Sequence, residues 1–119
     1  MKRILAVDDS RTLREMLFDC LTGAGHEVFT ACDGAEALDA LRRHRPDIVI
    51  TDLNMPVMDG IDFIEAARAE EAGRGVPLLL LTTETADELK LRARRVGATG
   101  WLTKPFNEAQ VLSLIDQLA

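Results

Sequence analysis

Acidic side chains follow two apolar runs that are typical of buried strands. Asp8 and Asp9 come directly after residues 4–7, and Asp52 closely follows residues 48–50 within "PDIVITDLNMPVMDG". Burying an unpaired carboxylate is costly, so buried acids are usually paired or bind a metal. These acids are therefore either turn residues and helix N-caps that emerge into solvent, or parts of one site that needs them.

A hydroxyl group and an ammonium group occupy comparable positions in two further runs. Thr82 ends the run at residues 78–81, and Lys104 follows the weaker run at residues 99–102. Each has an ordinary explanation alone, as a strand threonine and a solvated surface lysine. If the runs are parallel strands of one sheet, their carboxyl ends meet at one edge, and these groups lie beside the acids.

The combination of residue types indicates phosphoryl chemistry assisted by a metal. Three converging carboxylates would repel one another and raise at least one pKa, and a hard cation such as Mg²⁺, or Mn²⁺, relieves this repulsion. Zinc fits less well because neither His26 nor His44 lies at a strand end. Lys104 and Thr82 could neutralise and hydrogen-bond phosphoryl oxygens, and a carboxylate can itself be the nucleophile, giving an aspartyl phosphate.

Strands and helices alternate in the pattern of the chain. We expect strands at residues 4–7, 28–31, 48–50, 78–81 and 99–102. The first helical stripe, after a possible N-cap at Ser10, comprises Leu13, Met16, Leu17, Cys20, Leu21 and Ala24. Strict alternation with nearly continuous apolar strands predicts an α/β fold, a doubly wound five-stranded parallel sheet flanked by five helices.

Composition restricts the class of protein. The 119 residues suit a single domain, and 47% apolar with 29% charged residues is typical of a soluble globular protein. The net charge of −6 and the pI near 4.8 argue against direct binding of nucleic acid or of anionic membranes. No apolar run approaches the roughly 18 residues of a membrane span, and no signal peptide is recognisable, so we expect a cytoplasmic protein. The cysteines lack metal-ligand spacing, and we expect Cys20 to be a small buried thiol.

Four segments resemble the signatures of a known family. "VDDS", "TDLNMPVMDG", "LTTE" and "GATGWLTKPF" are similar, in order and interval, to those of bacterial response-regulator receiver domains, especially the stand-alone CheY-like chemotaxis regulators. The resemblance covers essentially the whole chain and implies one receiver domain over residues 1–119, without an output domain. It also implies a flavodoxin-like sheet with strand order 2-1-3-4-5.

The resemblance implies a role for each acid. Asp52 would accept a phosphoryl group from a phosphohistidine of a sensor histidine kinase. Asp9 and Asp52 would hold Mg²⁺ together with the backbone carbonyl of Asn54. Asp8 would act mainly through a metal-bound water.

The remaining site residues would respond to the phosphoryl group. Thr82 would move to hydrogen-bond a phosphoryl oxygen, and Lys104 would form an ion pair with it. The peptide bond between Lys104 and Pro105 would be cis, as the resemblance alone implies. Trp101 would rotate inward as Thr82 moves; without the resemblance, it would be read as core packing.

The fourth and fifth helices would form the docking face for partners. The fifth helix carries more apolar residues than one core stripe needs, so we expect Leu112 or Leu114 to be exposed. Lys90 and Arg94 lie on or near the fourth helix. They are either a solvated basic face or a site that recognises an acidic partner segment.

The lifetime of the phosphoryl group should depend on polar residues two positions beyond Asp52 and Thr82, which are Asn54 and Glu84. Both can orient an attacking water, a combination that the family associates with rapid self-dephosphorylation. Thr83 occupies a position often filled by a smaller residue, and its side chain could narrow access. A separate phosphatase therefore stays open as a partner.

The sequence leaves several functions open. The first is a monomeric, non-enzymatic switch, which receives phosphate from a CheA-like kinase and binds a flagellar motor switch protein. A phosphate sink and a phosphorelay intermediate are alternatives within the same family. A phosphohydrolase of the haloacid-dehalogenase type would use the same residue types, but it commonly has a second acid where Asn54 stands. A flavin- or nucleotide-binding module would need a first loop rich in Gly, Ser and Thr, whereas Asp8 and Asp9 repel phosphate.

Overall fold

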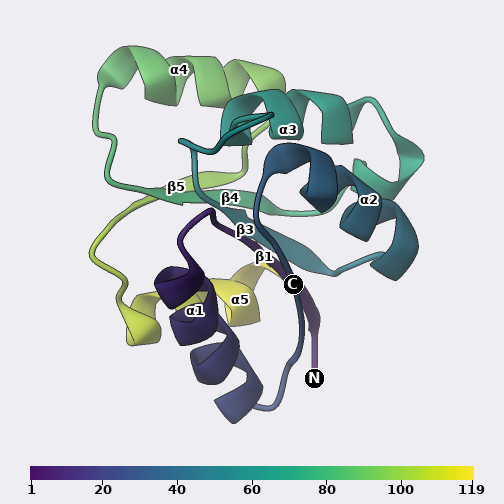
Figure 1. The fold of residues 1–119 in the computed structure, drawn as a ribbon, viewed down its shortest axis with the longest axis vertical. Coiled ribbons are helices and arrows are strands. Elements are labelled where there is room, and N and C mark those ends of the chain that lie inside the picture. The colour runs from purple at the N-terminus through teal and green to yellow at the C-terminus, as the bar shows by residue number, and fades with distance from the viewer.

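The computed structural model describes residues 1–119, and a five-stranded parallel sheet forms its centre (Figure 1). The strand order β2-β1-β3-β4-β5 and the parallel pairing confirm the expected doubly wound sheet. The observed strands begin or end within one residue of the predicted ranges. They are β1 (Arg3–Val7), β2 (Glu27–Ala31), β3 (Ile48–Thr51), β4 (Leu78–Thr82) and β5 (Gly100–Thr103).

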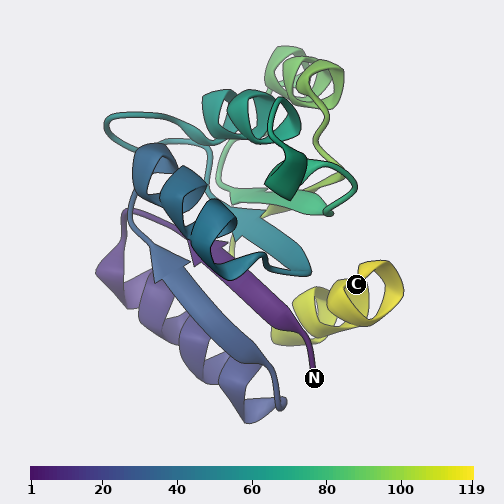
Figure 2. The same cartoon turned by 90° about the vertical axis from the view of Figure 1, so that its right-hand side faces the viewer.

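Helices cover both faces of the sheet. α1 and α5 lie on one face, and α2, α3 and α4 lie on the other, as the two cartoon views show (Figures 1 and 2). A short 3₁₀ helix, η1 (Glu71–Gly73), follows α3. The five α-helices are α1 (Arg11–Gly23), α2 (Gly34–His44), α3 (Gly60–Arg68), α4 (Asp87–Val96) and α5 (Glu108–Leu118).

The central strands are apolar throughout because both of their faces are buried. Along β1, Ile4 and Ala6 pack with α1 and α5, while Leu5 and Val7 pack with α2 and α3. Successive side chains of a strand point to opposite faces, so a strand with two covered faces needs no polar position. Burying each such Leu, Ile or Val contributes about 1.5 to 3 kcal/mol, and the core is continuous on both sides of the sheet.

Short polar side chains start four of the α-helices. Ser10, Asp33, Asp59 and Asn107 each accept a hydrogen bond from a backbone N–H in the first turn of the following helix. The predicted N-cap at Ser10 is thereby confirmed, with its Oγ 3.3 Å from the Leu13 nitrogen. No helix has both the length and the apolar composition that crossing a bilayer requires.

Several side chains differ from the expected burial. Met16 is exposed and Cys20 only half-buried, because Leu17 and Leu21 form the row of α1 that meets the sheet. On α5, Val111 and Ile115 are buried.

The expectation that Leu112 or Leu114 is exposed was wrong. Both are half-buried and pack at the border of the α1/α5 cluster, on either side of the row that Val111 and Ile115 form. The exposed leucine is Leu118, in the last turn of the helix.

A glycine lets α3 begin directly against the loop that follows β3. The Gly60 N–H donates to the Leu53 carbonyl at 2.8 Å. A Cβ atom at Gly60 would lie only 2.1 Å from the Asp52 carbonyl oxygen. The start of α3 therefore packs directly against the backbone of Asp52 and Leu53, and position 60 has no room for a side chain.

We predict that Gly60→Ala lowers the free energy of unfolding by about 2 to 3 kcal/mol, since the loop at Asp52 must shift to admit a methyl group. The matched control is Gly23→Ala at the end of α1, where an added Cβ meets nothing within 4 Å. It should stabilise the protein slightly, by about 0.5 kcal/mol, through helix propensity. Urea denaturation measures both, and equal stabilities for the two variants would contradict this account.

Candidate functional site

Three carboxylates converge at the carboxyl ends of β1 and β3. Asp8, Asp9 and Asp52 each place a carboxylate oxygen within 4.8 Å of the others. Asp8 is 2% exposed and Asp52 is 8% exposed, whereas Asp9 faces solvent. The strand-end positions predicted from the sequence are thus adjacent in space, because β1 and β3 are neighbours in the sheet.

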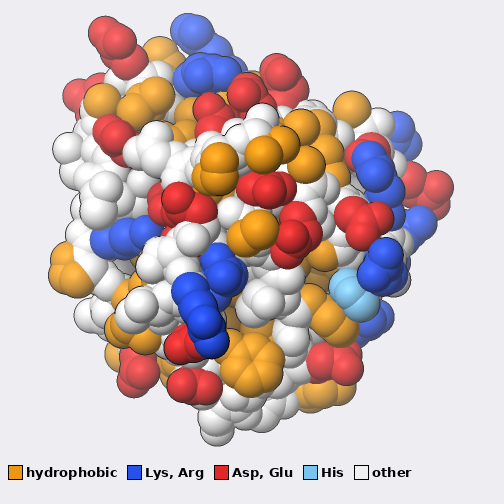
Figure 3. All heavy atoms as spheres, in the orientation of Figure 1, with side chains coloured by type: hydrophobic (Ala, Val, Ile, Leu, Met, Phe, Trp, Pro, Cys, Tyr) orange, Lys and Arg blue, Asp and Glu red, His pale blue; other side chains and the backbone are white.

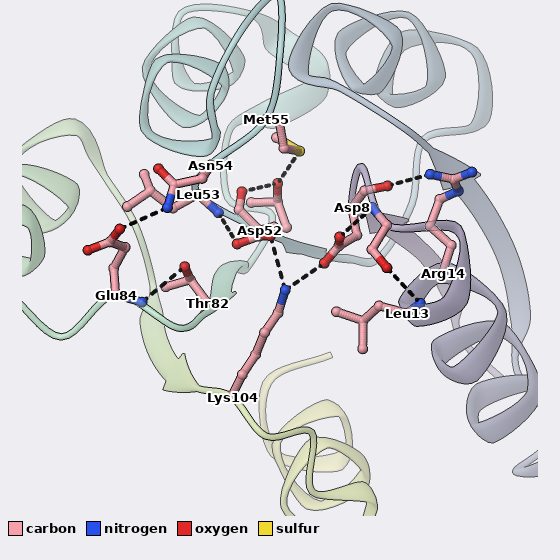
Figure 4. Close-up of polar contacts among 12 residues, drawn as sticks. Asp8, Leu13, Arg14, Asp52, Leu53, Asn54, Met55, Thr82, Glu84 and Lys104 are labelled. Carbon is pink, nitrogen blue, oxygen red and sulfur yellow. Dashed lines mark hydrogen bonds and ion pairs between the residues drawn. The ribbon is translucent and has the colours of Figure 1, made fainter.

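A lysine ammonium joins two of these acids. Lys104 Nζ lies 3.0 Å from Asp8 Oδ2 and 3.0 Å from Asp52 Oδ2 (Figure 4). Lys104 follows β5 directly, and its backbone N–H donates to the Thr82 carbonyl at 2.8 Å, which continues the pairing of β5 with β4. The peptide bond between Lys104 and Pro105 is cis, as expected.

Burial and charge set the pKa values in this cluster. Burial raises the pKa of Asp8, and the charge of Asp52 adds to this effect against the hydrogen bonds from Ser10 and Lys104. Burial alone would lower the pKa of Lys104, but its bonds to Asp52 and Asp8 raise it overall. The lysine therefore stays charged, while the acids still outnumber it.

Asp52 has a donor for each carboxylate oxygen. Its Oδ1 accepts from the Leu53 N–H at 2.7 Å, and its Oδ2 accepts from Lys104. Two fixed donors on a nearly buried side chain hold the carboxylate in one orientation at the floor of the cluster. A group that approached from the open side would meet Asp9 first, because only this acid is exposed.

The donor set fits a hard divalent cation. It offers only oxygen atoms, and its acids exceed the charge of the single nearby ammonium, which are the conditions that favour Mg²⁺ over zinc. Asp9 and Asp52 would hold such an ion, and Asp8 could reach it through water. The expected backbone ligand, the Asn54 carbonyl, lies two residues beyond Asp52.

Glu84 connects three of the predicted site residues. Its carboxylate accepts from the Asn54 side-chain amide at 2.9 Å, and its N–H donates to the buried Thr82 hydroxyl at 3.3 Å (Figure 4). Its carbonyl accepts from the Trp101 indole N–H at 3.1 Å. Sequence reasoning assigned Glu84 only to dephosphorylation and did not predict this junction, because a backbone carbonyl partner has no sequence signature. Thr83 beside it is exposed.

The predicted partner surface divides between the two faces of the sheet. Lys90 lies over the Trp101 ring, 6.0 Å from its centroid, and both line a hollow of about 130 Å³ with Arg94. Basic side chains also project over α4 at the top of the molecule (Figure 3). Leu112 and Leu114 pack on the opposite face with α1 and α5, so they are not part of this hollow.

Sequence reasoning also missed Arg14. Its Nη1 donates to the Asp8 carbonyl oxygen at 2.7 Å (Figure 4). Side chains in the first turns of a helix lean back toward its N-terminus, so an arginine four residues after the Ser10 N-cap can reach the end of the preceding strand. That geometric rule was the available signal.

Comparison with known proteins agrees with this architecture. The profile of the response regulator receiver domain matches residues 4–116. The probable transcriptional regulatory protein TcrX of Mycobacterium tuberculosis is 38% identical over 92% of this chain and 46% of its own length. The DNA-binding response regulator MtrA of Mycolicibacterium paratuberculosis is 38% identical over 96% of this chain and 49% of its own length. The chain thus spans about half the length of these curated relatives.

Solved structures give the same result over whole chains. The chemotaxis protein CheY4 of Vibrio cholerae is 46% identical, with a TM-score of 0.95 over 100% of this chain and 99% of that one. The receiver domain of the sensor histidine kinase PA1611 from Pseudomonas aeruginosa, solved with a magnesium ion in its active site cleft, is 28% identical, with a TM-score of 0.90 over 98% of this chain and 96% of that one. With its sequence, fold and acidic cluster in agreement, this chain belongs to the response-regulator receiver domains of two-component signalling.

Proposed function

We propose that this receiver domain accepts a phosphoryl group on Asp52 from a histidine kinase, in a reaction that needs Mg²⁺ bound by the acidic cluster. The observation that carries the proposal is the fixed Asp52 carboxylate, held by the Leu53 N–H and Lys104 beside two further acids. An isolated acid in a turn would need neither the lysine nor the cluster.

The transfer makes one bond and breaks one. An Asp52 oxygen forms a bond to phosphorus while the bond from phosphorus to the donor's histidine nitrogen breaks, and the imidazole leaves with the electron pair. The bound metal supplies positive charge to the phosphoryl oxygens. Lys104 would neutralise a further oxygen. The Thr82 hydroxyl accepts from the Glu84 N–H and donates to no group in this structure, so its proton is free to be donated to another phosphoryl oxygen.

We predict that a small-molecule phosphodonor and Mg²⁺ add the mass of one phosphoryl group to the protein, and that Asp52→Asn abolishes the addition. Intact-mass spectrometry measures this, and the same reaction with EDTA tests the need for metal. Phosphorylation of Asp52→Asn to the same extent as the wild type would show that another residue is the acceptor.

The decay of the phosphorylated form tests the proposed role of Asn54 and Glu84. The bond between their side chains holds both in place, so each alanine variant should slow hydrolysis, and the double variant should slow it by less than the product of the single effects. The exposed Thr83 is proposed to narrow access for water, so Thr83→Ala should shorten the lifetime.

We predict that Lys104→Met destabilises the protein by about 3 kcal/mol near neutral pH, because it leaves Asp8 and Asp52 buried without a positively charged partner. Loss of the ammonium raises the pKa of Asp8 further, because the hydrogen bond and charge of Lys104 lower that pKa in the wild type. An acid whose pKa is higher in the folded state favours folding as the pH falls, so the loss of stability should shrink as the pH is lowered from neutral.

Mg²⁺ separates this explanation from simple loss of packing. A divalent cation can replace the missing ammonium, so it should raise the melting temperature of Lys104→Met more than that of the wild type. Equal shifts in the two proteins, or a variant as stable as the wild type, would contradict the proposed charge balance.

We further propose a role in chemotaxis, with a flagellar motor switch protein as the target. Similarity to CheY4 over 99% of that chain supports this. The curated relatives TcrX, a probable transcriptional regulatory protein, and MtrA, a DNA-binding response regulator, are covered only by about half of their length. The hollow beside Trp101 is lined by Lys90 and Arg94, which favours an acidic segment of the partner.

We predict that purified motor switch protein binds the phosphorylated chain more tightly than Asp52→Asn, and that Lys90→Glu or Arg94→Glu weakens this binding by about tenfold or more through charge reversal. Arg92→Gln is the control, because Arg92 pairs with Asp62 on α3. Calorimetry measures the affinities.

Equal binding by both phosphorylation states would favour a phosphate sink or a phosphorelay intermediate. Steady turnover of a phosphate ester that disappears in Asp52→Asn would instead favour a phosphohydrolase.

A further inference from the structure

Arg14, in the second turn of α1, is hydrogen-bonded to the loop between β1 and α1, which carries Asp8 and Asp9. Its Nη1 donates to the Asp8 carbonyl oxygen at 2.7 Å, and this is its only side-chain hydrogen bond (Figure 4). It forms no ion pair, although Glu15 is its neighbour in sequence. The guanidinium therefore acts on the backbone of the loop.

The Asp8 carbonyl needs this donor because the sheet provides none. The Asp8 N–H still continues the pairing with β2, donating to the Ala31 carbonyl at 3.1 Å, but no backbone N–H donates to the Asp8 oxygen. A hydrogen bond from a charged donor to a carbonyl is shorter and stronger than one from a neutral donor. Arg14 thus fixes the peptide plane between Asp8 and Asp9.

Asp9 depends on its neighbours for its position. It is exposed, and neither its backbone nor its carboxylate forms a hydrogen bond. The bonds that orient it lie on either side. Arg14 holds the preceding carbonyl, and the following Ser10 N–H donates to Asp8 Oδ1 at 2.9 Å.

We propose that Arg14 is a positioning residue for the divalent cation, acting by holding the Asp8 carbonyl so that Asp9 points toward Asp52. The inference rests on the proposed metal-binding role of these acids. Residues that support metal ligands in this way typically change affinity 10- to 100-fold when removed.

The charge of Arg14 and its hydrogen bond to Asp8 have opposite effects on the affinity for the cation, which makes the proposal testable. A guanidinium near the cluster repels a divalent cation, so losing its charge alone would raise affinity. Losing the hydrogen bond frees the loop and lowers affinity. The sign of the change therefore identifies which effect dominates.

The experiment is calorimetric titration of MgCl₂ into the wild type, Arg14→Gln and Arg11→Gln. Arg11 is a matched control because it lies on the same helix and, like Arg14, lines a hollow beside Phe18 and Asp19. Its guanidinium, however, pairs with Glu15 at 3.0 Å. We expect Arg14→Gln to weaken Mg²⁺ binding about tenfold. Arg11→Gln should bind as the wild type does or slightly more tightly.

A second readout separates positioning from catalysis. With a small-molecule phosphodonor, Arg14→Gln should need about tenfold more Mg²⁺ for half-maximal phosphorylation, while the maximal rate stays near that of the wild type. Arg14→Lys, which keeps the charge and one donor on a shorter side chain, should fall between the wild type and Arg14→Gln. Thermal unfolding without Mg²⁺ establishes that each variant is folded.

The outcomes are distinct. Unchanged or tighter binding by Arg14→Gln, or an equal loss in Arg11→Gln, overturns the proposal. If Arg14→Gln does not fold, Arg14→Lys decides, and wild-type affinity in that variant overturns the proposal. A wild-type protein that does not bind Mg²⁺ would instead refute the proposed function on which the inference rests.

Discussion

The ammonium of Lys104, shared between Asp8 and Asp52, is the interaction on which the rest of the structure depends. Two nearly buried carboxylates so close together would repel each other, and a buried charge without a partner is among the most destabilising features a fold can contain. The lysine reaches them from the end of β5, across the ends of β4 and β3. One side chain thereby links the far edge of the sheet to its centre, and the fold and the site stabilise each other.

Lys104 neutralises only part of the negative charge of the acidic cluster, and the remaining negative charge is the basis of the proposed function. Asp9 adds a third acid on the open side, so the cluster favours a further cation and, with that cation, a phosphoryl group. In the proposed function, Glu84 would carry a change at Asp52 outward. It bonds Asn54 and Thr82 near the cluster and the Trp101 indole beside α4, so a shift of Thr82 would act directly on the surface that Lys90 lines.

Much of this arrangement could be predicted from the sequence. Asp8, Asp52, Thr82 and Lys104 follow or end apolar runs, and the meeting of parallel strand ends brings such residues together without knowledge of their side-chain conformations. The strand order came from family resemblance, because periodicity does not determine which strands are neighbours. Arg14 and the Glu84 carbonyl were missed because both interactions involve a backbone carbonyl, which no residue type identifies, and for Arg14 only its place in the first turns of α1 was a signal. The placement of Leu112 and Leu114 failed because helical periodicity alone does not distinguish the edge of a core from an exposed surface.

The most direct test of the central claim is a crystal structure with Mg²⁺ and beryllium trifluoride, which imitates a phosphoryl group on a carboxylate. We expect the trifluoride on Asp52, with Lys104 and the Thr82 hydroxyl both in contact with fluorine atoms and the metal held by Asp9 and Asp52. A structure in which Lys104 still bridges Asp8 and Asp52, with no metal beside Asp9, would contradict it.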